Sequence, residues 1–268
     1  MTKDASESRP FTFQKHELSE FANLDELYYR DKIQPSEEKY NSIDKEEALV
    51  RGDKRLSILP RLESLGISPS GEGVDLGAGS GWLTAQLSAL TSVNRVHAVE
   101  YSEWQLEQVA PSIIERLGGI SDKVVLHRGD MHRLNMFGNK SLDFVAASAV
   151  LHHATDLGEV LRECHRVLHR DGLMLAICEP GIPRIVTPLT RGLSAEKFGA
   201  EERQHGVREQ TLFESEWRQA FEAANFRVRF IPMFVRSVTW RAQVVRSSPL
   251  RWTNGLLFWD KAIVAYSE

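Results

Sequence analysis

The stretch VDLGAGSG, residues 74–81, decides the fold class. An apolar, strand-like run ends at a turn with glycines at three alternate positions, and a helical pattern begins at Trp82. Glycine permits the sharp bends and the close ligand approach that such a turn needs, and the start of the next helix favours an anionic group. The spacing is GxGxG and not the GxGxxG typical of dinucleotide-binding folds. The stretch therefore predicts a strand, a ligand-binding turn and a helix, and it argues against a dinucleotide.

The residues that follow alternate between strand-like and helix-like patterns. Strands are expected at residues 74–76 and at Arg95–Glu100, Val124–Arg128, Leu142–Ser148, Leu173–Cys178, Phe226–Phe234 and Lys261–Tyr266. Helices are expected at Trp82–Leu90, Ser102–Leu117, Asp156–Leu168 and Glu214–Ala224. Such alternation predicts an α/β fold with a mainly parallel, seven-stranded sheet and helices on both faces.

The segments outside this alternation suggest how the chain is organised. Residues 1–65 are rich in helix formers, with helical spacing in Gln14–Tyr29 and Pro35–Leu65, and are expected to form a helical N-terminal cap. Residues 66–268 are expected to form the main domain. Two long connections, at about 180–211 and about 235–260, read as insertions, because long loops in compact domains are more often lids or binding elements than plain connectors.

Composition excludes several classes of function. The chain has 268 residues, 42% of them hydrophobic, and a formal net charge of −4, which argues against general nucleic-acid binding. The only cysteines, Cys164 and Cys178, lack the spacing of metal ligands, so neither a metal site nor a disulfide is expected. No signal peptide and no apolar run of about 18 residues is present, which predicts a cytoplasmic protein without a membrane span.

Acidic residues follow two more of the expected strands. Glu100 ends the second strand, where a carboxylate can accept hydrogen bonds from both hydroxyls of a ribose. Asp130 and Met131 follow the third, where a carboxylate can accept from an adenine amino group and an apolar side chain can cover the ring. The alternatives are a solvated glutamate at a strand end and an aspartate in an ordinary turn.

Together these motifs resemble the class I S-adenosylmethionine-dependent methyltransferases, particularly the type 11 group. The resemblance is close from Gly71 to Glu179 and implies a Rossmann-like fold whose last strand, Lys261–Tyr266, is antiparallel. It implies S-adenosyl-L-methionine as cofactor and S-adenosyl-L-homocysteine as product. The glycine turn would hold the methionine moiety. The implied cofactor-binding residues are Asp75, Gly77, Ala78, Gly79, Gly81, Glu100 (ribose), Tyr101, Asp130 and Met131 (adenine), and Ser148.

Methyl transfer is an in-line displacement, in which alignment of the reactants contributes about 7–11 kcal/mol. A hydroxyl acceptor would also benefit from a general base, with a gain of about 10²- to 10⁴-fold. The candidates for such a base or for a contact with the substrate are His152, His153, Glu179 and His205. Each has a structural alternative, since a histidine can pack against the cofactor loop or a helix, or lie on a surface loop.

The acceptor is indicated only by absences. The chain lacks the Asn-Pro-Pro-Tyr and Pro-Cys sequences of DNA methyltransferases, which favours a hydroxyl or other nucleophile of a small molecule or sugar-containing metabolite. A catalytically silent cofactor-binding module, a macromolecule methyltransferase and a nicotinamide-dependent oxidoreductase are the alternatives. The segment Val235–Trp259 combines four arginines and three tryptophans without an acidic residue. It would either recognise an anionic or sugar-bearing acceptor or form a solvated amphipathic cap.

Overall fold

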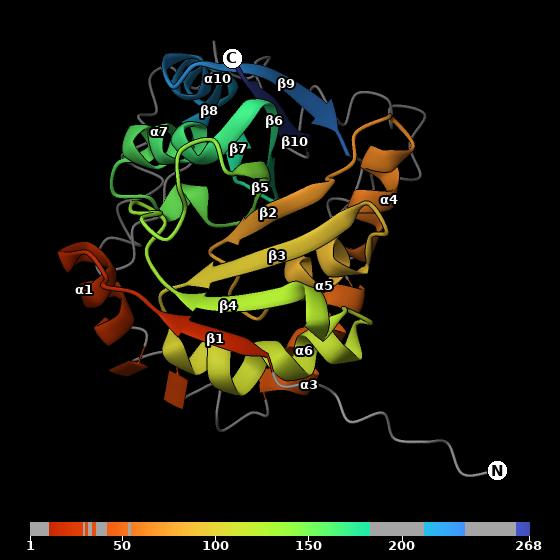
Figure 1. Cartoon of the computed structure of the whole chain (residues 1–268), viewed down its shortest axis with the longest axis vertical. Coiled ribbons are helices and arrows are strands. Elements are labelled where there is room, and N and C mark those ends of the chain that lie inside the picture. The colour runs from red at the N-terminus through yellow and green to blue at the C-terminus, as the bar shows by residue number, and fades with distance from the viewer. Residues whose placement is uncertain are drawn as a thin grey trace.

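The computed structural model describes residues 11–28, 30–31, 34–35, 42–52, 55–182, 212–233 and 261–268. Within these ranges one eight-stranded sheet has the order β1-β4-β3-β2-β5-β6-β10-β9, and β7 and β8 form a separate pair. The strands are β1 Thr12–Lys15, β2 Gly71–Leu76, β3 Val93–Glu100, β4 Val124–Arg128, β5 Leu142–Ser148, β6 Leu168–Ile177, β7 Gly181–Ile182, β8 Leu212–Phe213, β9 Phe226–Pro232 and β10 Lys261–Ser267. In Figure 1 the red strand β1 and the blue strand β9 mark the two edges of the sheet.

The sheet is parallel from β1 to β6, and β10 is antiparallel to both of its neighbours. This arrangement confirms the predicted Rossmann-like fold with an antiparallel last strand. The connecting helices are α1 Glu20–Tyr28, α3 Ser42–Gly52, α4 Ile58–Glu63, α5 Trp82–Ala89, α6 Ala110–Arg116, α7 Leu157–Val167 and α10 Glu214–Ala223. Shorter helical turns lie at Arg55–Ser57, Gln105–Val109, Ser121–Lys123 and Leu151–His153.

Successive side chains of the central strands are buried alternately in two apolar layers, one on each face of the sheet. Val145 and Ala147 of β5 face a core built with α7 and α10, whereas Phe144 and Ala146 face a core built with α4, α5 and the helix before α6. Period-two alternation with both faces apolar is what a strand covered by helices on both sides requires. In Figure 1, α7 and α10 lie on one side of the sheet, and α4 and α5 lie on the other.

Local sequence signals account for several helix boundaries. The carboxylate of Asp156 accepts a hydrogen bond from the backbone N–H of Glu159 at 2.9 Å and caps α7. The Ser102 hydroxyl accepts from the N–H of Gln105, as expected for the start of the helix that leads into α6. That helix is π-helical over Gln105–Val109. Pro111, which cannot donate a backbone hydrogen bond, lies just beyond this turn.

The structure differs from the sequence-based prediction at the N-terminus. Residues 12–15 form the edge strand β1 beside β4, so the sheet has eight strands instead of seven, and the helix expected from Gln14 begins only at Glu20. Phe13 explains the difference, because it and Phe11, two residues before it, pack against the apolar cluster beside β3 and β4, whereas Thr12 and Gln14 are exposed. β6 also begins earlier than expected, at Leu168.

Parts of the predicted organisation lie outside the described residues. The two predicted insertions fall almost entirely on residues 183–211 and 234–260, so His205 and the arginine- and tryptophan-rich segment are not described. Across the described ranges no helix combines the length and the apolar character needed to cross a bilayer. The same ranges contain no cluster of three or more His, Cys, Asp or Glu side chains arranged to hold a metal ion.

Candidate functional site

The glycine turn after β2 has backbone angles that other residues rarely adopt. Gly77 and Gly81 have φ angles of 64° and 79°. A Cβ atom on Gly77 would lie 2.2 Å from a methyl carbon of Val150, and one on Gly81 would lie 2.9 Å from Ile114. Both positions therefore require glycine, for conformation and for space. They fix the turn between the strand and α5 and leave Gly79 facing open space.

A cavity of about 260 Å³ opens beside this turn, at the carboxyl ends of β2, β3 and β5. Its lining residues are Glu46, Asp75, Gly77, Ala78, Gly79, Ser80, Trp82, Leu83, Glu100, Tyr101, Gln105, Ser148, Ala149, Val150 and His153. Three of these described residues are acidic, and none is lysine or arginine. Such a lining favours a ligand that carries positive charge and disfavours one with a pyrophosphate group.

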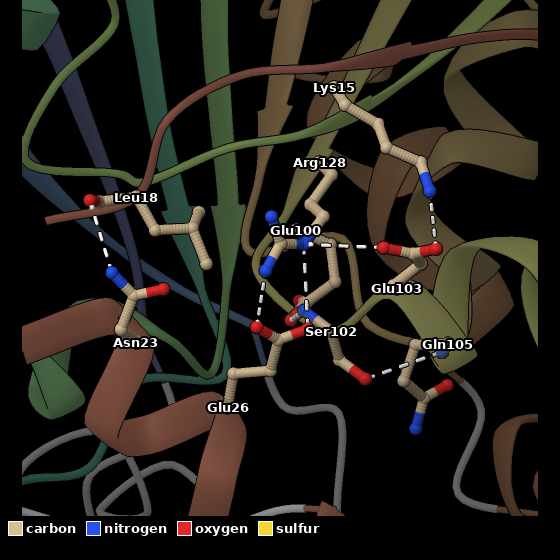
Figure 2. Close-up of polar contacts among 9 residues, drawn as sticks. All are labelled: Lys15, Leu18, Asn23, Glu26, Glu100, Ser102, Glu103, Gln105 and Arg128. Carbon is tan, nitrogen blue, oxygen red and sulfur yellow. Dashed lines mark hydrogen bonds and ion pairs between the residues drawn. The ribbon is translucent and has the colours of Figure 1, made fainter.

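Glu100 connects the end of β3 to the glycine turn. One oxygen of its carboxylate accepts a hydrogen bond from the N–H of Gly79 at 3.0 Å. The other oxygen accepts from the N–H of Ser102, also at 3.0 Å (Figure 2). The side chain is buried, and this burial raises the pKa of Glu100 despite the hydrogen bonds. Since each carboxylate oxygen has two lone pairs, acceptor capacity is left for a ligand in the cavity.

Asp75 lies in β2, beneath the turn. Its carboxylate accepts a hydrogen bond from the Thr84 hydroxyl at 2.6 Å. Burial raises the pKa of Asp75 to about 7, the Thr84 bond opposes this effect, and the nearby Glu100 charge adds to it. The group therefore changes charge near neutral pH, next to the place where a ligand would lie.

Asp130 is held by the protein itself. One of its oxygens accepts hydrogen bonds from the backbone N–H and the ring Nδ1 of His132, and the other accepts from the N–H of Ser19 at 3.3 Å. Burial alone would raise the pKa of Asp130, but these bonds outweigh it and lower the pKa to about 2. Asp130 follows the strand next to Glu100, yet neither it nor Met131 lines the cavity. Met131 packs against the core on the α7 side of the sheet.

Glu179, at the end of β6, is also held by protein groups. Its carboxylate accepts hydrogen bonds from the backbone N–H groups of Val150, Leu151 and His152 and from the ring Nδ1 of His152, at 2.7–3.2 Å. Neither Glu179 nor His152 lines the cavity. Glu179 therefore fixes the segment after β5. His153 does line the cavity, and its ring centroid lies 4.0 Å from that of His152.

Two N-terminal elements lie at this edge of the sheet. Glu26 of α1 forms an ion pair with Arg128 at the end of β4, and Arg128 also lies near Glu103 (Figure 2). Glu46 of α3 lines the cavity itself and accepts a hydrogen bond from the Ser80 hydroxyl at 3.0 Å. Glu46 cannot be singled out from the sequence, because nothing in the pattern of a charged amphipathic helix indicates which cavity a given side chain will line.

Comparison with known proteins agrees with this geometry. Residues 74–176 match a family model described as a methyltransferase domain, of type 11. The match confirms the resemblance inferred from the sequence, and it begins within β2 and ends within β6, so it includes the glycine turn and Glu100. This family, to which S-adenosylmethionine-dependent methyltransferases belong, supports the predicted enzyme class and cofactor.

The individual relatives are more distant. A malonyl-[acyl-carrier protein] O-methyltransferase of Legionella pneumophila is 30% identical over 118 residues, which are 44% of this chain but only 39% of that protein. The YcgJ protein of Bacillus subtilis is 21% identical, with a TM-score of 0.56 over 80% of this chain and 99% of its own. A geranyl diphosphate methyltransferase in complex with S-adenosylmethionine is 17% identical, with a TM-score of 0.55 over 80% of this chain and 84% of its own. At these identities the two structures establish the fold alone.

Proposed function

We propose that the chain is an S-adenosylmethionine-dependent methyltransferase that acts on a nucleophile of a small molecule. The observation that carries the proposal is the charge of the cavity beside the glycine turn, with Glu46, Asp75 and Glu100 in its lining and no lysine or arginine among its described residues. A sulfonium and an ammonium group suit these carboxylates, whereas the pyrophosphate of a nicotinamide cofactor does not.

Within this proposal, the residues at the strand ends bind and orient the cofactor. Glu100 would accept hydrogen bonds from the ribose with the acceptor capacity that its bonds to the protein leave. Tyr101, Gln105 and Ser148 line the same cavity, where Tyr101 and Gln105 would border the adenosine and Ser148 would lie near the reacting centre. The cofactor would supply a methyl group on a sulfonium, which the acceptor attacks in line. The roles inferred from the family for Asp130 and Met131 remain predictions.

His153 is the described histidine best placed to accept a proton from an acceptor hydroxyl. It lines the cavity, whereas His152 and Glu179 lie behind it and hold the segment that carries it. We therefore assign His153 the role of general base and His152 and Glu179 that of positioning residues. Loss of a general base lowers kcat by about 10²- to 10⁴-fold. Helix α3, which falls within the predicted N-terminal cap of residues 1–65, contributes Glu46 to the same cavity as the predicted main domain of residues 66–268.

The test is a transfer experiment with methyl-labelled S-adenosylmethionine. The full chain is incubated with the labelled cofactor and fractionated cell metabolites, and the labelled products are identified by mass spectrometry. We expect a labelled small molecule whose formation falls by about 10²-fold or more with His153→Gln. Label found only in protein, as on an acyl-carrier protein, or only in RNA would contradict the small-molecule acceptor. Slow hydrolysis of the cofactor without any labelled product would contradict turnover and favour a silent binding module.

A further inference from the structure

Helix α3 has two adjacent glutamates with different surroundings. Glu47 forms ion pairs with Arg51 on its own helix and with Arg116 at the end of α6. Glu46 points instead to the cavity beside the glycine turn and lines it. Consecutive residues of a helix do not share a face, so α3 attaches to α6 with one side and reaches the cavity with another.

Two contacts orient Glu46. Its carboxylate accepts a hydrogen bond from the Ser80 hydroxyl, and the guanidinium of Arg55 lies 3.8 Å from the same oxygen. Arg55 is itself held over the ring of Trp82, 5.6 Å from its centroid. Ser80 belongs to the glycine turn, and Trp82 is the first residue of α5. These contacts hold Glu46 at the end of the cavity that borders the turn.

The other two carboxylates of the cavity have different partners. Glu100 accepts from two backbone N–H groups, and Asp75 is fully buried beneath the turn and bonded to Thr84. Glu46 keeps 26% of its side chain exposed and approaches from a separate helix. Its position beside polar Ser80 suits a group that both carries positive charge and donates hydrogen bonds. The sulfonium of the proposed cofactor donates none, whereas its α-ammonium donates three.

We propose that Glu46 recognises the α-ammonium group of the amino-acid part of the cofactor. This inference rests on the proposed function, because it requires that an S-adenosyl compound occupy the cavity. It makes the N-terminal cap part of the binding site, where α3 supplies a charged hydrogen-bond acceptor to the ligand.

The test compares two ligands that differ in the amino-acid part. S-adenosylhomocysteine carries the α-ammonium, and 5′-methylthioadenosine has the same adenosine and sulfur without it. Binding of each to the full chain is measured by calorimetry for the unaltered protein, Glu46→Gln and the control Glu47→Gln. Glutamine keeps the shape of Glu46 and an oxygen for Ser80 but removes the charge. Because a hydrogen bond to a charged group is strong, we expect Glu46→Gln to weaken the binding of S-adenosylhomocysteine by about tenfold. The affinity for 5′-methylthioadenosine should stay within about twofold.

The control and the remaining outcomes separate this inference from the proposed function. Glu47→Gln should leave both affinities unchanged, because Glu47 pairs with Arg51 and Arg116 away from the cavity. Equal binding of S-adenosylhomocysteine by Glu46→Gln and the unaltered protein would overturn the inference and leave the proposed function standing. Equal weakening of both ligands would overturn it too, since Glu46 would then only support the turn. Failure of the unaltered protein to bind S-adenosylhomocysteine would overturn both.

Discussion

Carboxylates stand at the carboxyl ends of several strands of this sheet, and they fall into two regions. At β2 and β3, Asp75 and Glu100 line a cavity, and their pKa values are raised by burial. Beyond β4 and β6, Asp130 and Glu179 lie away from that cavity and accept three and four hydrogen bonds from the protein. We call the first the open region and the second the closed region.

The comparison shows that a buried carboxylate at a strand end can serve either a ligand or the fold. In the closed region, protein donors occupy the oxygens, so removal of the carboxylate leaves several buried N–H groups without an acceptor. In the open region, Asp75 and Glu100 also accept hydrogen bonds from the protein, but both line the cavity, so their charge and remaining acceptor capacity are available to a ligand. Substitutions in the closed region should therefore change stability, and those in the open region should change cofactor affinity.

Among these substitutions, we expect the largest effect from Glu179→Ala in the closed region, on the free energy of unfolding. Glu179→Ala would leave three backbone N–H groups and the His152 ring without their acceptor, and we expect the free energy of unfolding to fall by about 4 kcal/mol. Urea denaturation followed by circular dichroism measures it. Glu222→Ala is the control, because Glu222 is exposed and pairs only loosely with Arg218. If Glu179→Ala lowered the free energy of unfolding no more than this control does, the structural role assigned to the closed region would be contradicted.

A substitution of Glu100 in the open region should lower the affinity for S-adenosylhomocysteine. Glu100→Gln places an amide against a backbone N–H of Gly79 or Ser102 and removes the charge, so S-adenosylhomocysteine should bind about 50-fold more weakly, or about 2–3 kcal/mol. Glu103→Gln, on a partly exposed residue of the same segment that pairs with Lys15 and lies outside the cavity lining, should bind as the unaltered protein does. Calorimetric titration of the two variants side by side measures the difference. Equal dissociation constants for Glu100→Gln and Glu103→Gln would show that Glu100 does not bind the ligand.

Asp130 gives the sharpest test of the division, because the family resemblance predicts an adenine contact for it. Its pKa of about 2 means that the carboxylate stabilises the fold above pH 4 and that this contribution is lost as pH falls from about 4 to about 2. We expect Asp130→Asn to lose about 2 kcal/mol at pH 7 and almost nothing near pH 2, as measured by denaturation at both pH values. Affinity for S-adenosylhomocysteine should change less than about threefold. A loss of affinity with unchanged stability would move Asp130 into the open region.

We expect the smallest effect from Asp75, which should make the affinity for the cofactor depend on pH. A bound cation favours the ionised carboxylate, so binding releases a proton, and affinity should rise with pH as Asp75 ionises around its pKa of about 7. We expect S-adenosylmethionine to bind up to about tenfold more tightly at pH 8 than at pH 6. Titrations in buffers of different ionisation enthalpy would also detect the released proton. Asp75→Asn should flatten this profile, and a profile that survives the substitution would assign the titration to another group.

Local patterns were sufficient to predict most of the fold. β4 and β5 match their expected bounds, and α10 ends within one residue of its expected end, because apolar periodicity and turn residues act over a few positions. β1 was missed because it has four residues and only Phe13 of them is partly buried, which is too short a pattern to oppose a helical interpretation. The glycine turn and Glu100 were found because motif and strand end coincide in the sequence.

The division between open and closed regions could not be predicted, because it depends on donors from distant segments. Ser19 donates to Asp130 from 111 positions away, and the His152 ring donates to Glu179 from 27 positions away. The carboxylates look alike in the sequence, since each lies near the end of an apolar strand or just after it. Glu46 was missed for the same reason, because the contact between α3 and the glycine turn exists only in the folded chain.

The central claim is that the cavity at the ends of β2 and β3 binds an S-adenosyl compound. Calorimetric titration of the full chain with S-adenosylhomocysteine, and separately with NADH, tests it most directly. We predict saturable binding of one S-adenosylhomocysteine per chain and no detectable binding of NADH. No saturable heat with S-adenosylhomocysteine, or tighter binding of NADH, would contradict the account.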